Sequence, residues 1–315
     1  METAHAEAGA TGSEGAASPS GAGGDRAGRA TAAGSAPQAP VQQARIALSG
    51  TETEEDWRIL LETVRQARAA GLDTVPMGDA VAAIGRTFVG EPYTPGTLEV
   101  GDREALVVNL REFDCVTFVE NTLAIARTLR LTDSTDPEVL KRTFVGELAG
   151  LRYRGGSLNG YPSRLHYFSE WIADNAARGH LVPLTAELGG VVDPEPVRFM
   201  STHPDAYRQM ADPEVREAIV RIESSLGERT WIPQDRIAGI EERIKDGDVI
   251  AATSTVEGLD VAHTGIALHV DGRLHLMHAP LVGKSVEISE LPLAERIRGI
   301  RGQDGIMVAR PLEPR

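Results

Sequence analysis

One cysteine and three closely spaced histidines are the residues best suited to chemistry in this 315-residue chain. Cys115 is the single cysteine, and His263, His275 and His278 follow far downstream within two short apolar runs. A thiolate is a strong nucleophile, and a histidine exchanges protons near neutral pH. A cysteine inside an apolar pattern is more often a buried packing residue, so the segment around Cys115 alone leaves both roles open.

The residues around Cys115 predict that it begins a helix. In "FDCVTFVENTLAIARTL", residues 113–129, apolar side chains recur at helical spacing from Cys115 onward. Asp114 precedes it, and Asp is a preferred N-cap. At that position the unpaired backbone N–H groups and the helix dipole favour a thiolate and could hold an oxyanion. The position therefore favours reactivity, although Cys115 also lies on the apolar stripe.

The three histidines are predicted to lie on one β-hairpin. The runs "HTGIALHV" and "RLHLMHAP" are joined by an Asp-Gly pair at 271–272, a sequence that favours a two-residue type I′ turn. Counting back from that turn, His263 and His278 point to one face of the hairpin and His275 points to the other. His263 and His278 would be diagonal neighbours about 7–8 Å apart at the backbone. A register slip of one residue would exchange the roles of His275 and His278.

The rest of the pattern predicts helices first and an antiparallel sheet afterwards. Apolar residues at helical spacing mark 52–71, 136–151 and 163–179, and two further helical pieces are expected within 202–226. Strand-like runs fill the last third of the chain. This order is typical of the α+β class.

The chain is predicted to divide into a tail and one folded domain. Residues 1–48 are rich in Ala, Gly, Ser and Pro and contain no Phe, Tyr or Trp. Such a segment cannot bury enough apolar surface to offset its ordering entropy, so it is predicted to be disordered. It also lacks the basic start and apolar core of a secretory signal. Residues 49–315 are predicted to form the folded domain.

Composition excludes several classes of partner. The 32 basic and 46 acidic residues give a net charge of −14. This balance argues against a nucleic-acid backbone or an anionic membrane surface as the main partner, because both need a cationic face. No uninterrupted apolar run has membrane-spanning length, so no integral membrane segment is expected. A single cysteine cannot form an intrachain disulfide, which leaves the redox compartment undecided.

The motifs together resemble those of the NlpC-type cell-wall hydrolases, a papain-like superfamily. "FDCVTFVENTLA", "AHTGIALHVDG" and "LMHAP" are similar to its Cys, His and third-polar-residue motifs, and "GEPYTPGTLE" is similar to its Gly-x-Pro-Tyr element. "YPSRLHYFSEWIADN", "FMSTHPDAY" and "IPQDRI" resemble one branch, the N-acetylmuramoyl-L-alanine amidase-like proteins. The likeness covers residues 50–312. One departure is Val116-Thr117 after the cysteine, where many relatives have Ser-Gly.

The resemblance implies a papain-like fold, in which N-terminal helices pack on a C-terminal antiparallel sheet or small barrel. It implies that Cys115 is the nucleophile, that His263 is the general base and acid, and that His278 orients His263. Tyr93 would lie near the cysteine and assist the oxyanion or the substrate. Residues 131–240, which lengthen the chain relative to compact members, are expected to be a largely helical insertion that shapes the pocket.

The "SRLHY" element would line the substrate groove through Arg164, His166 and Tyr167, by the same resemblance. The residues themselves allow other roles, because Arg164 could be a solvated helix residue and Tyr167 an amphipathic packing residue. No metal and no organic cofactor are expected.

The implied activity is cysteine-dependent hydrolysis of the amide between N-acetylmuramic acid and L-alanine in peptidoglycan or muropeptides. A stem-peptide endopeptidase would use the same triad. Less favoured alternatives are a zinc amidase that uses His263, His275 or His278 with a carboxylate, although no HExxH element is present, and a non-catalytic glycan-binding module. The substrate class suggests a periplasmic or secreted protein, while the missing export signal leaves a cytoplasmic location open. The oligomeric state is not indicated.

Overall fold

The computed structural model describes residues 46–281 and 285–315. Residues 1–45 of the predicted tail lie outside the described residues, and the last residues of that tail contact the folded part. Leu48 forms a parallel β-bridge with Leu106, whose backbone N–H donates to the Ala47 carbonyl oxygen at 2.9 Å.

Helices dominate the first part of the described chain and strands the last third, which confirms the α+β prediction. The α-helices of the described ranges are α2 (Glu54–Ala69), α3 (Met77–Arg86), α4 (Cys115–Leu131), α5 (Pro137–Arg152), α6 (Phe168–Ala177), α7 (Phe199–Thr202), α8 (Pro213–Ser225) and α9 (Leu293–Gly299). The strands are β1 (Leu181–Pro183), β2 (Val191–Asp193), β3 (Arg229–Pro233), β4 (Val249–Ser254), β5 (Val261–Val270), β6 (Arg273–His278), β7 (Glu287–Ile288) and β8 (Gln303–Pro311).

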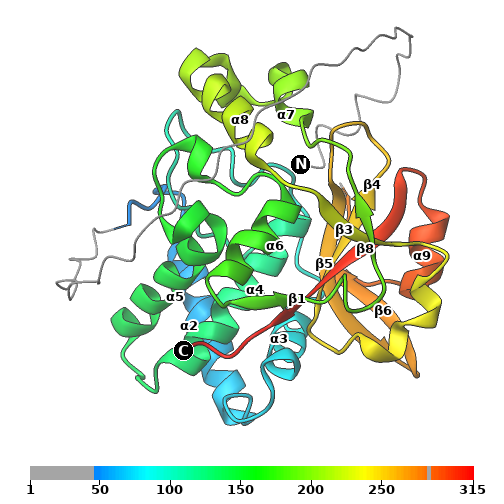
Figure 1. The fold of residues 1–315 in the computed structure, drawn as a ribbon. Coiled ribbons are helices and arrows are strands. Elements are labelled where there is room, and N and C mark those ends of the chain that lie inside the picture. Colours follow the sequence, from blue (N-terminus) through cyan, green and yellow to red (C-terminus); the bar gives the residue numbers. More distant parts are fainter. Residues whose placement is uncertain (1–45, 282–284) are drawn as a thin grey trace, which may run out of the picture.

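These strands form one antiparallel sheet between two unequal layers. Its order is β2-β3-β8-β4-β5-β6-β7, and β1 pairs separately with β8. The helices α2 to α6 gather on one side of the sheet and α9 lies on the other (Figure 1). Because side chains alternate along a strand, Val249 and Ala251 of β4 face the large cluster with the helices, whereas Ile250 and Ala252 face the smaller one with α9.

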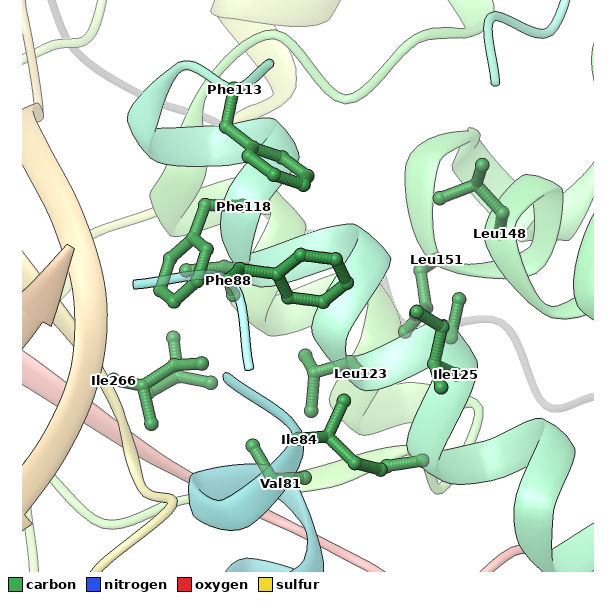
Figure 2. Packing of buried hydrophobic residues seen from close by; sticks show 14 of the residues in the cluster. Val81, Ile84, Phe88, Phe113, Phe118, Leu123, Ile125, Leu148, Leu151 and Ile266 are labelled. Atoms are coloured by element: carbon green, nitrogen blue, oxygen red, sulfur yellow. The ribbon is translucent and has the colours of Figure 1, made fainter. Parts of the chain in front are cut away.

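Aromatic packing holds the beginning of α4 in place (Figure 2). Phe113, just before the helix, meets Phe88 with ring centroids 5.0 Å apart and Phe118 with centroids 6.1 Å apart, both edge to face. All three side chains are buried. Such aromatic pairs contribute about 0.5–1.5 kcal/mol beyond their buried area. Since Phe113 and Phe118 flank Cys115, their packing fixes where the first turn of α4 lies.

One sequence-based expectation is incomplete and another is wrong. The region 131–240, predicted to be largely helical, contains α5 to α8 and in addition β1, β2 and β3, which all join the sheet. Strands of three to five residues are too short to show a period-two pattern. The helix predicted over 163–179 begins only at Phe168, because Arg164 forms an antiparallel bridge with Tyr153 instead. Among the helices of the described residues, none is long and apolar enough to cross a membrane.

A close backbone contact joins α3 to the turn before β4. Gly247 has a φ of 83°, and a Cβ atom there would overlap the Gly78 carbonyl oxygen. That oxygen belongs to the backbone at the start of α3, so it cannot move aside without shifting the helix.

We expect Gly247→Ala to lower the free energy of unfolding by about 2–5 kcal/mol, combining left-handed strain with overpacking. Gly272→Ala is the matched control, because Gly272 has a similar φ of 78° and nothing within 4 Å of the added Cβ. Its free energy of unfolding should fall by about 1–2 kcal/mol, from the left-handed strain alone. Urea denaturation measures both, and equal losses would show that the contact with Gly78 contributes nothing.

Candidate active site

Cys115 is the first residue of α4, as the N-cap pattern predicted. Asp114 caps the helix: its carboxylate accepts the Thr117 backbone N–H at 2.7 Å, while the Thr117 hydroxyl accepts the Asp114 N–H at 2.9 Å. The first backbone N–H groups of a helix have no acceptor within the helix. Cys115 therefore lies where the helix dipole favours an anion, and its side chain is buried at 4% exposure.

The hairpin register is the predicted one. Val270 pairs with Arg273 and Ile266 with Met277, and the turn residues Asp271 and Gly272 have φ values of 50° and 78°. Two successive positive φ values are what a type I′ turn requires.

This register brings two histidines into direct contact. His263 Nε2 and His278 Nδ1 are 2.8 Å apart, and the ring planes meet at 89°. Both residues are buried, at 3% and 1% exposure. His275 points to the other face, where its Nδ1 contacts the Ser289 carbonyl oxygen at 2.8 Å. The predicted sharing of one face by His263 and His278 is confirmed.

Strand β5 contacts α4 at the first residue of the helix. The Thr264 hydroxyl donates to the Cys115 carbonyl oxygen at 2.8 Å, and both residues are buried. Thr264 directly follows His263 in the chain. The contact therefore brings the beginning of α4 next to the beginning of the histidine hairpin, although the two segments are 149 residues apart in sequence.

Tyr93 lies beside the chain segment that enters α4. It forms a parallel bridge with Phe113, whose N–H donates to the Pro92 carbonyl oxygen at 3.0 Å and whose carbonyl accepts the Thr94 N–H at 2.9 Å. The Tyr93 side chain is 6% exposed. Tyr93 is thus paired with Phe113, which lies two residues before Cys115 in the chain.

Arg164 holds the loop that follows Tyr93. Its guanidinium makes two bonds to Glu104, at 3.0 and 2.7 Å, and one to Glu99 at 2.7 Å. The side chains of Arg164 and Glu104 are 7% and 3% exposed. Tyr153 adds a hydroxyl bond to Glu104 at 2.9 Å. Both hydrogen-bonding edges of Arg164 are thus occupied by protein carboxylates. This favours a structural role, in which Arg164 holds the loop with Glu99 and Glu104, over direct contact with substrate.

His166 and Tyr167 are also engaged with protein groups. His166 Nε2 contacts the Tyr161 carbonyl oxygen at 2.9 Å, and burial followed by the charge of Arg164 lowers the pKa of His166 well below its usual value. The Tyr167 hydroxyl donates to Glu223 at 2.6 Å and accepts the Met200 N–H at 2.8 Å. A groove-lining role for Arg164, His166 and Tyr167 stays a prediction.

The sequence interpretation missed three residues near the hairpin. Besides Thr264, Glu287 on β7 is the ladder partner of His278, with its Oε1 3.8 Å from His278 Nε2. Asp260, just before β5, accepts N–H groups from Ser169 at 2.7 Å and Val261 at 2.8 Å, and burial raises its pKa. Single polar residues in short segments give no periodic signal, so only the fold identifies them.

Metal-binding geometry is not found in the described part of the chain: no three His, Cys, Asp or Glu residues there are grouped to hold an ion. A surface hollow of about 620 Å³ lies instead at the turn end of the hairpin, lined among others by Arg86, Arg273 and His275. His263 and His278 do not line it. This hollow and the reactive groups are therefore in different places, and the candidate site is assigned by its chemistry.

Comparison with known proteins gives a consistent family. A model of the AmiA-like family, described as N-acetylmuramoyl-L-alanine amidase-like, matches residues 83–305. An N-acetylmuramoyl-L-alanine amidase from Bacteroides uniformis aligns with a TM-score of 0.70 and 36% identity, over 75% of this chain and 99% of its own. A comparison with curated proteins gave no match.

Two other solved structures are similar. A protein from Bacteroides fragilis, described as a candidate xylanase, aligns with a TM-score of 0.66 and 37% identity, over 72% of this chain and 98% of its own. A protein from Legionella pneumophila aligns with a TM-score of 0.61 over 84% of this chain and 98% of its own, and at 21% identity it shows the fold alone.

Removing the hydrogen bond from Thr264 to the Cys115 carbonyl tests how much it contributes to stability. Thr264→Val keeps the shape of the side chain and removes the donor, so we expect the free energy of unfolding to fall by about 0.5–1.5 kcal/mol. Thr264→Ser keeps the hydroxyl and should lose less. Urea denaturation compares the two, and a larger loss in the Ser variant would show that methyl packing matters more than the bond.

Because Arg164 pairs with Glu104 and Glu99, we expect its replacement to lower the stability of the fold strongly. Arg164→Met would leave the buried Glu104 carboxylate unpaired and should cost about 3–5 kcal/mol of unfolding free energy. Glu99→Gln is the control, because the Glu99 side chain is 37% exposed and its pair with Arg164 is worth about 1 kcal/mol or less. Thermal and urea unfolding measure both. An Arg164→Met protein of unchanged stability but impaired substrate binding would support the groove-lining role instead.

Proposed function

The chain belongs to the AmiA-like family of N-acetylmuramoyl-L-alanine amidase-like proteins, and we propose that it is a cysteine-dependent amidase acting on peptidoglycan or muropeptides. The proposed site has a papain-like arrangement in which Cys115 is the nucleophile, His263 the proton carrier and His278 the residue that orients His263. The observation that carries the proposal is the Thr264 bond to Cys115, which holds the residue next to His263 against the first residue of α4.

The first half of the reaction forms a thioester. Because His263 Nε2 contacts His278, Nδ1 is the nitrogen that takes the Cys115 thiol proton in this mechanism. The thiolate attacks the carbonyl carbon that joins the lactyl group of N-acetylmuramic acid to L-alanine, giving a tetrahedral oxyanion. Backbone N–H groups in the first turn of α4 are suited to stabilise that oxyanion, with Tyr93 nearby.

The second half regenerates the cysteine. Protonated His263 gives its proton to the nitrogen of the departing L-alanine, so that the peptide leaves as a free amine and the muramoyl group stays on Cys115. Water then attacks the thioester carbonyl as His263 takes one of its protons. The C–S bond breaks, the proton on His263 returns to the Cys115 thiolate, and the muramoyl product leaves as the carboxylic acid, which releases the second proton of the water to solvent.

A glycosidase mechanism fits these residues less well. Glycoside hydrolysis uses two carboxyl groups that flank the scissile bond, about 5–10 Å apart. The proposed site combines a thiol and two imidazoles, with the Glu287 carboxylate 3.8 Å from His278, and the carboxylates of Glu99 and Glu104 are bound to Arg164. The Bacteroides fragilis relative therefore does not change the proposal.

We expect mass spectrometry of a defined muramoyl-peptide to detect free stem peptide that begins with L-alanine. Cys115→Ala and His263→Gln should each lower the rate by at least about a thousandfold, because a nucleophile and its base act as a unit. His275→Gln is the matched control, since its side chain points to the other face of the same hairpin. It should stay active.

Other products would point to other functions. Cleavage within the stem peptide would make the protein an endopeptidase with the same triad. Chelator-sensitive cleavage that survives in Cys115→Ala would replace the cysteine mechanism with a metal-dependent one. Undiminished binding of the muramoyl-peptide without any cleavage, in wild type and Cys115→Ala alike, would indicate a glycan-binding module.

A further inference from the structure

We propose that Glu287 is a positioning residue that fixes the protons of the His263–His278 pair and stabilises the positive charge formed there. The proposal rests on the cysteine mechanism above and adds a fourth residue to the set Cys115, His263 and His278. Glu287 and His278 are directly opposite in the β6–β7 ladder, and Glu287 Oε1 lies 3.8 Å from His278 Nε2. This distance is longer than a hydrogen bond and within the range of an ion pair.

The contact between two neutral imidazoles requires one donor and one acceptor. If His263 Nδ1 takes the thiol proton, the ring hydrogen of neutral His263 must be on Nε2, which then donates to His278 Nδ1 at 2.8 Å. The ring hydrogen of His278 must in turn be on Nε2. That nitrogen is the one nearest the Glu287 carboxylate, so the carboxylate favours the single tautomer of His278 that the mechanism requires.

The same carboxylate acts on the charged state. When His263 accepts the thiol proton, the pair becomes positive, and an opposite charge within about 4–6 Å favours that form. Strand β6 packs against α4, β5, β7, α9 and the turn Glu241–Arg243. Glu241 of that turn and Glu295 of α9 pair with Arg273 at the other end of β6, whereas His263 of β5 and Glu287 of β7 lie at His278. Cys115 is the ionisable group at the beginning of α4. Glu287 therefore supplies a negative charge next to His278, the member of the pair that does not take the thiol proton in this mechanism.

The partial exposure of Glu287 limits its influence on the histidine pair. The His278 side chain is 2% exposed and that of Glu287 is 39% exposed. Solvent around Glu287 weakens the interaction, so we expect a shift of moderate size rather than loss of activity. A carboxylate that only solvates the edge strand β7 would change neither tautomer nor charge.

The test compares Glu287→Gln with wild type and with Glu290→Gln, the substitution of an exposed carboxylate three residues further along. The alkaline limb of the kcat/KM profile reports loss of the proton from the histidine pair. Without Glu287 that proton is held less strongly, so the limb should move to lower pH by about 0.5–1 unit, a three- to tenfold loss of rate on that limb. Glu290→Gln should match wild type.

Two readouts separate this proposal from the proposed function. Alkylation of Cys115, the single cysteine, needs no substrate, and its pH profile should shift in the same direction in Glu287→Gln. Nitrogen NMR of labelled histidine should show the hydrogen of His278 on Nε2 in wild type and a mixed tautomer in the variant. Superimposable profiles and unchanged tautomers in Glu287→Gln would overturn the role of Glu287 while the amidase remained cysteine-dependent. Cleavage that survives Cys115→Ala would instead overturn the amidase mechanism itself.

Discussion

The two-residue turn between β5 and β6 sets the hairpin register, and the register decides which ionisable groups meet. Asp271 and Gly272 both have positive φ, which matches the twist of the strands that they connect. With this register, His263 and His278 lie on one face and contact each other, while His275 points away. A shift by one residue would reverse every side chain of β6, separating the two rings. The arrangement of the proposed site therefore begins in a turn at the far end of the hairpin.

A second constraint fixes the position of α4 among the helices. Aromatic packing of Phe113 and Phe118 fixes the first turn of the helix. Further along α4, the buried Glu120 carboxylate accepts from Arg152 of α5 at 2.6 Å and from Trp171 of α6 at 3.2 Å. A buried ion pair contributes little net stability but is costly to break, so it specifies how the three helices pack. The position of Cys115 is thus set from both sides of its first turn.

Local features of the site could be predicted from sequence, and features that depend on tertiary contacts could not. The N-cap at Asp114 and the Asp-Gly turn are decided by residues adjacent in the chain, so their patterns specified the start of α4 and the face shared by His263 and His278. Arg164 shows the opposite case. Its partners Glu99 and Glu104 are 65 and 60 residues away, and no periodic pattern indicates that pairing. The contacts of Thr264 and Glu287 could not be predicted for the same reason.

The choice of histidine as the third residue of the proposed triad has a physical consequence. A carboxylate in that position only accepts hydrogen bonds, so it fixes the tautomer of the catalytic histidine without further help. A histidine can donate or accept through the same nitrogen, and His278 would therefore orient His263 only if its own tautomer were fixed. That requirement moves one step outward, to whichever group interacts with His278 Nε2. Glu287 is the carboxylate opposite that nitrogen in the β6–β7 ladder, which is why a two-residue edge strand can matter to chemistry that takes place at the beginning of α4.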